Sequence, residues 1–119
     1  MPSRDPIQRF EDILQNIELI EEFTAGLTES TFTQDRKTVY ATERCLERIS
    51  EAAAKLGDAA ETRCPEIPWP RIRALGNLLR HEYDTVDVAR VWILIEDNLP
   101  SLKITVEAAL ERMRREGAK

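Results

Sequence analysis

The sequence predicts an all-α fold, an antiparallel bundle of four to five helices that forms one domain over residues 1–119. Apolar residues recur at helical spacing along most of the chain. Leu, Glu, Ala and Arg, which favour helices, dominate the long segments, whereas the 4 glycines and 6 prolines fall mostly where helices would end. No alternation of polar and apolar residues, as a half-buried strand would require, competes with this pattern.

Two long helices are expected in the first half of the chain. The first spans residues 6–26, because Asp5 can cap it and a proline suits its first turn. A turn follows at residues 28–33. The second helix spans residues 34–56 and, after a Gly-Asp break, has a helical tail that can extend to residue 63. Their expected apolar faces consist of Ile7, Phe10, Ile13, Leu14, Ile17 and Ile20 in the first helix, and of Val39, Leu46, Ile49, Ala53 and Leu56 in the second.

A proline-rich linker opens the second half. It covers residues 65–70, since each proline pushes the preceding residue out of the α region, and Trp69 is expected to pin it. A helix is predicted over residues 70–82, and a turn then leads to Asp87, which can cap the next helix. The segment at residues 98–100 kinks or restarts the chain into a last helix. The apolar faces of these last two helices are Val88, Val91, Trp92 and Ile95, and Leu102, Val106, Ala109, Leu110 and Met113.

The charge of the chain is distributed unevenly. A net charge of −5 argues against indiscriminate binding to nucleic acids. Residues 1–36 are strongly acidic, whereas residues 63–81 carry four arginines and a single glutamate. A polyanionic partner would therefore contact residues 63–81 or the basic end at residues 112–115. At that end, the helix dipole alone also favours basic side chains.

No feature of the sequence indicates a membrane or an oxidising compartment. The N-terminal residues lack the apolar run of a signal peptide, and no segment approaches the ~20 apolar residues of a transmembrane helix. Cys45 and Cys64 stand alone, without a Cys-x-x-Cys pair or further histidines that could complete a metal site. We therefore expect a cytoplasmic protein with buried, reduced thiols, no cofactor and no membrane contact.

The candidate site lies in the predicted helix over residues 70–82. One stripe of this helix, roughly 100° wide, gathers polar groups, and the opposite side is predicted to be buried. His81, the single histidine, titrates near neutrality, and guanidinium groups bind phosphate, so the stripe suits metal-free cleavage of RNA. In that reading His81 acts as acid or base, and Arg73 or Arg80 binds the phosphate. The alternative is a lone surface histidine in a charged helix. The polar stripe consists of Arg73, Asn77, Arg80, His81 and Asp84, and the apolar side of Ile72, Leu75, Leu78 and Leu79.

Gly76 interrupts the same predicted helix. A glycine in a helix interior costs about 1 kcal/mol relative to alanine. Either the helix breaks there, or a neighbour packs too closely for a β-carbon. That neighbour could be a second copy of the helix or the alanines at residues 52–54.

These residues together resemble the HepT-like branch of the HEPN superfamily. The central block is Ile67-Pro-Trp-Pro-Arg-Ile-Arg-Ala-Leu-Gly-Asn-Leu-Leu-Arg-His-Glu-Tyr-Asp-Thr-Val-Asp87, followed by Val91-Trp92 and Leu99-Pro100-Ser-Leu102. Upstream, Ile49-Ser-Glu-Ala-Ala53 is similar to a family segment that usually reads Ile-Gly-Glu-Ala-Ala. The similarity covers nearly the whole chain in the expected order.

The resemblance implies a function as well as a fold. It implies a homodimeric helical bundle in which the motif helices of two protomers face one cleft. It implies a metal-independent endoribonuclease that cuts RNA as the toxin of a toxin–antitoxin pair. The usual partner is a nucleotidyltransferase-fold antitoxin of the MntA type, which attaches AMP to a tyrosine. His81 matches the catalytic histidine, Asn77 the polar motif residue and Tyr83 the modified tyrosine.

The chain departs from the family pattern at one place. The pattern is an arginine, four to six further residues and then the histidine, whereas Gly76-Asn77 stands here where Arg-Asn is usual. Arg73 lies too far before His81, and Arg80 is adjacent to it. Arg73 could reach across one extra turn, Arg80 could act instead, or the catalytic arginine is lost. In the last case the protein would be a non-catalytic HEPN dimer that binds a nucleotidyltransferase partner.

Overall fold

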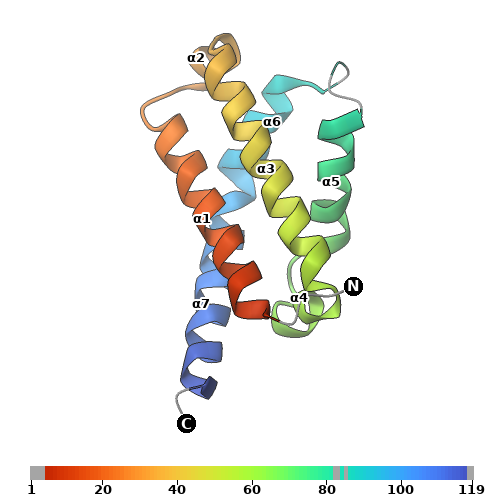
Figure 1. The fold of residues 1–119 in the computed structure, drawn as a ribbon. Helices are drawn as coiled ribbons and strands as arrows, with labels where there is room; N and C mark the ends of the chain where they lie inside the picture. Colours follow the sequence, from red (N-terminus) through yellow and green to blue (C-terminus); the bar gives the residue numbers. More distant parts are fainter. Residues whose placement is uncertain (1–4, 82–83, 85, 118–119) are drawn as a thin grey trace.

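The fold is an all-α bundle, as the sequence predicts. The computed structural model describes residues 5–81, 84 and 86–117, and within these ranges it contains seven helices and no strand (Figure 1). The helices are α1 (Pro6–Thr24), α2 (Glu29–Gln34), α3 (Arg36–Leu56), α4 (Asp58–Arg63), α5 (Trp69–His81), α6 (Val88–Asp97) and α7 (Leu99–Gly117).

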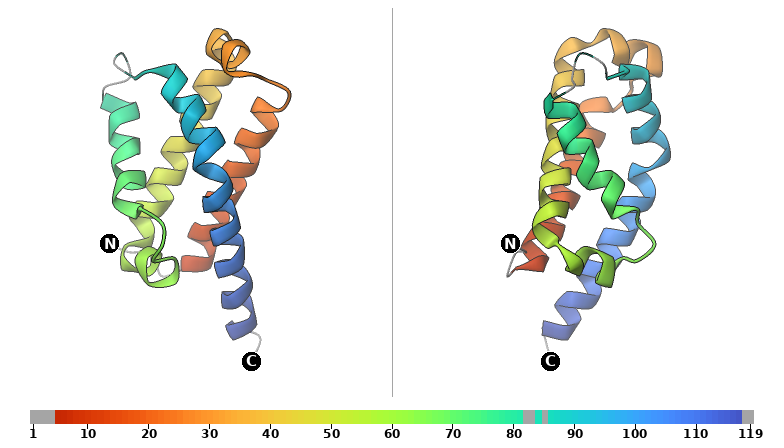
Figure 2. Two further views of the ribbon diagram at one scale, coloured as in Figure 1. Left: turned by 180° about the vertical axis from the view of Figure 1, so that it is seen from behind. Right: turned by 90° about the vertical axis from the view of Figure 1, so that its right-hand side faces the viewer.

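Helix α3 is the centre of the bundle. Helices α1 and α5 lie along its two sides, and α7 packs against α1 on the other face of the molecule (Figures 1 and 2). Helix α6 leads into α7, and the short α2 joins α6 to α3 at one end of the bundle. The core lies between α1, α3 and α7. Its fully buried side chains include Phe10, Ile13, Ile17 and Ile20 of α1, Leu46, Ala53 and Leu56 of α3, and Val106, Ala109 and Leu110 of α7.

Side-chain caps fix where the helices begin. The carboxylate of Asp5 accepts the backbone N–H of Gln8 at 3.1 Å, and the carboxylate of Asp87 accepts that of Ala89 at 3.0 Å, so both predicted caps are confirmed. The break between α3 and α4 is also confirmed, because Gly57 adopts a φ of +56°, which favours glycine.

One predicted turn is wrong. Residues 28–33 were expected to form a turn, but most of them belong to α2, which Thr28 opens with a reciprocal capping box to Thr31. Phe32 anchors this short helix, because its ring is buried and packs against the ring of Trp92, with 5.2 Å between the two ring centroids. Helix α5 begins at Trp69, which agrees with the predicted start at about residue 70.

The linker before α5 is pinned by Trp69. The Trp69 side chain is completely buried, its Nε1–H donates to the carbonyl oxygen of Cys64 at 2.9 Å, and its ring meets that of Phe10 edge-on. These contacts fix the first turn of α5 against α1 and α4. The direction in which α5 presents its remaining side chains follows from this anchor.

Candidate functional site

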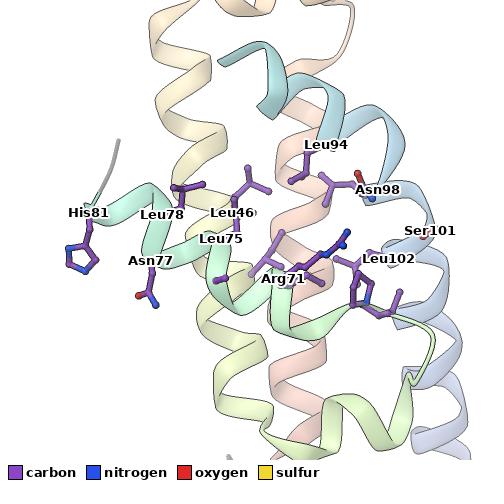
Figure 3. A pocket seen from close by; sticks show the side chains of 16 residues that line it. Leu46, Arg71, Leu75, Asn77, Leu78, His81, Leu94, Asn98, Ser101 and Leu102 are labelled. Carbon is purple, nitrogen blue, oxygen red and sulfur yellow. The ribbon is translucent and has the colours of Figure 1, made fainter. Parts of the chain in front are cut away.

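A groove runs between α5 on one side and α6 and α7 on the other. Its volume is about 830 Å³, and most of its lining is apolar (Figure 3). Leu46 and Ile49 of α3 form its buried floor. The walls come from α5 and from the α6–α7 pair, and they include Leu75, Leu78, Leu94 and Leu102. We call this feature the α5–α7 groove.

Asn77 and His81 lie at the rim of the α5–α7 groove. Both side chains are exposed, and Figure 3 shows them extending to the same side of α5. Their spacing of four residues places them on successive turns of one helix face. The predicted juxtaposition of Asn77 and His81 therefore exists, next to an apolar groove.

The apolar side of α5 is divided between the core and this groove. Leu79 is buried, as predicted, and Ile72 packs against the core. Leu78 was predicted to be buried but is 40% exposed, and Leu75 is half-buried in the wall of the groove. The prediction was wrong for Leu78 because helical periodicity gathers apolar residues on one side without showing that another helix covers all of that side.

Arg73 is held by the ends of α3 and α4. Its guanidinium donates to the carbonyl oxygens of Ala53 (3.3 Å) and Gly57 (3.0 Å) and forms a two-pronged ion pair with Glu61 at 2.7 and 2.8 Å. The hydrogen bond from Arg73 lowers the pKa of Glu61, and the same bond raises that of Arg73. Arg73 therefore joins three helices, and its charge is already neutralised by a carboxylate.

Arg80 has a different environment. The side chain is exposed, and its Nη2 donates to Oδ1 of Asn77 at 3.0 Å. Among the residues that the structure describes, Arg80 makes no ion pair. Within the described part of the chain, its guanidinium therefore lies beside Asn77, one residue before His81, without a carboxylate partner.

Helix α5 is unbroken at Gly76 because Ser50 of α3 packs against it. The Ser50 hydroxyl donates to the carbonyl oxygen of Arg73 at 2.9 Å and accepts the backbone N–H of Gly76 at 3.1 Å. A β-carbon on residue 76 would come within 2.8 Å of Ser50 Cβ and closer still to its hydroxyl. Of the two explanations for Gly76, close packing is correct, and the neighbour is Ser50 of the same chain.

Two residues of the site were not assigned by the sequence. Ser50 was visible only within a segment of family resemblance, and the helical cost of Gly76 was the one signal that a close neighbour existed. Arg71 extends into the α5–α7 groove on the side of Asn98 and Leu102, apart from His81 (Figure 3). Its position on the helix lies outside the predicted polar stripe.

Other expected features lie elsewhere or fall outside the structure. Tyr83, the expected modification site, lies outside the described residues, whereas Asp84 is described and exposed.

Cys45 and Cys64 are both buried and free, and burial raises the pKa of the Cys64 thiol to about 11. Within residues 5–81, 84 and 86–117, no cluster of three His, Cys, Asp or Glu side chains is placed to hold a metal ion. None of the helices in these ranges combines the length and apolarity needed to cross a membrane.

Comparison with known proteins assigns the family. A family model described as ribonuclease HepT-like matches residues 13–109, which include every residue that lines the groove. The chain belongs to the HepT-like ribonuclease family. A HepT-like relative from Thermococcus cleftensis, named as a probable ribonuclease HepT, is 41% identical over 78% of this chain and 84% of its own length. A relative from Methanocaldococcus jannaschii, named as a candidate RNase, is 30% identical over 90% of this chain and 98% of its own length. No solved structure matches the chain significantly.

The membership confirms the resemblance found in the sequence. The matched region covers α3 and α5 in full, so the contact between Ser50 and Gly76 and the Asn77–His81 pair both lie inside the HepT-like domain. The seven helices of the described residues form the HEPN-type bundle that this membership implies.

Proposed function

We propose that this HepT-like protein is a metal-independent endoribonuclease whose site is the rim of the α5–α7 groove. The observation that carries the proposal is the grouping of His81, Asn77 and Arg80 on one exposed face of α5 in a chain of this family. Phosphodiester cleavage without a metal needs a group that transfers protons and a positive charge on the phosphate, and an imidazole and a guanidinium can supply these.

The chemistry assigned to these groups is attack by the RNA itself. The 2′-hydroxyl loses its proton to a base and attacks the adjacent phosphorus, and the 5′-oxygen of the next nucleotide leaves with a proton from an acid. The products are a 2′,3′-cyclic phosphate and a 5′-hydroxyl. His81 is suited to the proton transfers because imidazole exchanges protons near neutral pH. A guanidinium stabilises the negative charge that accumulates on the phosphate.

The same proposal includes a homodimer across the α5–α7 groove. Leu78 is 40% exposed in its wall, and Leu75 and Leu94 are only half-buried there, so this side of the chain presents apolar surface to water. A second copy that docked here about a two-fold axis would cover Leu78 and bring its own Asn77 and His81 to the same cleft. Two histidines would then be available, one as base and one as acid.

The biological role follows from the family resemblance and forms the last part of the proposal. We expect the ribonuclease to act as the toxin of a toxin–antitoxin pair whose antitoxin is an MntA-type nucleotidyltransferase. That partner would inactivate it by transferring AMP to Tyr83. The expected result is a mass increase of one AMP group with the partner and ATP, which Tyr83→Phe abolishes. Modification of Tyr83→Phe would contradict the assignment.

The decisive experiment is RNA cleavage by purified protein in EDTA. We expect the wild type to cut single-stranded RNA and to leave a substrate with 2′-O-methyl groups intact, because the nucleophile is then blocked. His81→Ala should keep the helical circular dichroism spectrum and lose cleavage by at least about 10²-fold. Tyr40→Ala, at an exposed position on α3, is the control for purification and folding. Full cleavage by folded His81→Ala would refute the mechanism.

One alternative has a specific observation in its favour. Position 76 carries glycine where the family usually has arginine, which favours a non-catalytic HEPN dimer that binds a nucleotidyltransferase partner. This alternative predicts AMP transfer to Tyr83 without RNA cleavage by the unmodified protein. We prefer the nuclease because the Arg80 guanidinium lies beside Asn77 and pairs with no carboxylate among the described residues.

A further inference from the structure

Gly76 lies at a close contact between α5 and Ser50 of α3. Residue 76 cannot carry a side chain while Ser50 is present, because its β-carbon would lie within 2.8 Å of Ser50 Cβ. The Ser50 hydroxyl is fixed there by its bonds to the carbonyl oxygen of Arg73 and the N–H of Gly76. Ser50 therefore covers the buried backbone of residue 76 and fills most of the space that a side chain there would need.

The guanidinium of Arg80 also lies against the space that a side chain at residue 76 would need. Its Nη1 lies 3.1 Å from the point where a β-carbon of residue 76 would be. Residue 80 is one helical turn after residue 76, and side chains on a helix lean toward its N-terminus, so the arginine folds back over the glycine. The second nitrogen, Nη2, is held by Oδ1 of Asn77 at 3.0 Å. The two terminal nitrogens of Arg80 are thus located beside Gly76 and beside Asn77, and Asn77 lines the groove.

The two candidate arginines differ in what they would lose by binding a phosphate. Arg73 would have to leave two backbone carbonyls and the carboxylate of Glu61. Glu61 would also repel the phosphate. Arg80 gives up no ion pair with any described residue. Its side chain is exposed, so the guanidinium can donate hydrogen bonds to a phosphate oxygen while Nη2 still donates to Asn77.

We propose that Arg80, seated over Gly76 and against Asn77, supplies the guanidinium that binds the RNA phosphate next to His81, and that Gly76 positions it. This inference rests on the proposed nuclease function. It gives Gly76 a role opposite to that of a lost catalytic residue, because the absence of a side chain at position 76 is what gives Arg80 its place. Arg73 has a structural role only.

The first test compares matched arginine variants in the cleavage assay, with a fluorophore–quencher single-stranded RNA of mixed sequence. Arg80→Ala should lower kcat by about 10²-fold, and Arg80→Lys should fall in between because lysine cannot make two parallel bonds. Arg73→Ala should lose stability but keep kcat within about threefold in its folded fraction. Arg44→Ala removes an equal charge from α3, where the guanidinium pairs with Glu47, and serves as the charge control.

The second test asks whether Gly76 acts through Arg80. Ser50→Gly/Gly76→Leu removes the clash with α3 and fills the place of the guanidinium, with Ser50→Gly as its control. We expect this double variant to fold and to lose cleavage, and we expect no further loss when Arg80→Ala is added. If Gly76 acts on stability alone, adding Arg80→Ala to the double variant should lower cleavage further, by as much as Arg80→Ala does in the wild type. That result would overturn the positioning role.

A binding measurement separates this inference from the nuclease proposal. Fluorescence anisotropy with the same RNA carrying 2′-O-methyl groups reports phosphate contacts without chemistry. Arg80→Ala should weaken binding about tenfold. It should also reduce the slope of log affinity against log salt concentration by about one, as expected when one phosphate contact is lost, whereas Arg73→Ala should change neither quantity. If the wild type binds but never cuts, the nuclease proposal fails and the binding comparison still decides which arginine contacts phosphate. Unchanged binding and cleavage by Arg80→Ala would refute the inference.

Discussion

At the scale of single residues, Gly76 and Ser50 determine how closely α5 approaches α3. A mid-helix glycine costs about 1 kcal/mol in helix propensity. The hydroxyl of Ser50 offsets this cost by bonding to the backbone of α5 twice, at 2.9 and 3.1 Å. The two residues therefore form one unit of packing, and a change at either should depend on the other.

We expect Gly76→Ala to lower the free energy of unfolding by about 1–3 kcal/mol, because the new methyl group overlaps Ser50. In the background of Ser50→Gly, the same substitution should become neutral or stabilising by up to about 1 kcal/mol. The overlap with Ser50 is then gone, and only the flexible end of Arg80, 3.1 Å from the new carbon, has to shift. Urea denaturation of the four proteins in this double-mutant cycle measures the coupling.

Gly117→Ala is the matched control, because a β-carbon there meets no atom within 4 Å. Additive effects of the substitutions at positions 50 and 76 would contradict the packing described for this contact.

Arg73 connects α5 to the ends of α3 and α4. Arg73→Ala should lower the free energy of unfolding by about 1–3 kcal/mol, because two carbonyl oxygens lose their donor together with Glu61. The pKa of Glu61 is lowered by its hydrogen bond from Arg73, so the carboxylate stabilises the fold above the unfolded pKa, near 4.5. That contribution is lost as the pH falls through the lower, folded-state pKa.

Urea denaturation at about pH 7 and about pH 3 tests whether the stabilisation by Glu61 is lost at low pH. The stability difference between wild type and Glu61→Gln should be larger at the higher pH. An equal or larger difference at the lower pH would show that the Arg73–Glu61 pair does not act as described.

At the scale of elements, the sequence predicted the long helices well but missed the short helix α2. Caps at Asp5 and Asp87 and the break at Gly57 are local signals, and they place the boundaries near the observed ones. Helix α2 has six residues and no apolar period of its own, so its buried Phe32 could not be recognised as an anchor from sequence alone.

The candidate site was predictable in the same partial way. Helical spacing predicted that Asn77 and His81 share a face, and the structure agrees. The spacing could not distinguish Arg73 from Arg80, since both lie on the polar stripe. Glu61, which binds one of them, belongs to α4, and only tertiary structure brings α4 to the end of α3.

The linker before α5 supports a further prediction. Trp69→Phe should keep the ring contact with Phe10 but remove the bond from Nε1 to the carbonyl oxygen of Cys64. We expect a loss of about 1–2 kcal/mol in the free energy of unfolding, together with the disappearance of the buried tryptophan emission. Trp92→Phe, at a half-buried position on α6, is the control. A larger loss for Trp92→Phe would contradict the role of Trp69 as the main anchor.

At the scale of the whole molecule, the bundle is closed on one side and open on the other. The core of α1, α3 and α7 is sealed, whereas α5 packs along α3 and stands away from α6 and α7 across the groove (Figure 2). An apolar groove with a 40% exposed leucine in its wall is poorly suited to a monomer in water. The polar rim with His81 and the apolar wall with Leu78 lie on one helix, so docking of a second copy and assembly of the site would occur together.

Leu78→Asp tests this link between assembly and activity. We expect the wild type to be a dimer by light scattering after size exclusion, and Leu78→Asp to be a folded monomer, because a charge on the groove wall would be desolvated in the interface. The monomer should lose RNA cleavage although His81, Asn77 and Arg80 are all retained. Tyr40→Asp places the same charge at an exposed position on α3 and should leave both mass and cleavage unchanged. A Leu78→Asp monomer with full activity would show that one chain suffices for the chemistry, and a Leu78→Asp dimer would place the interface elsewhere.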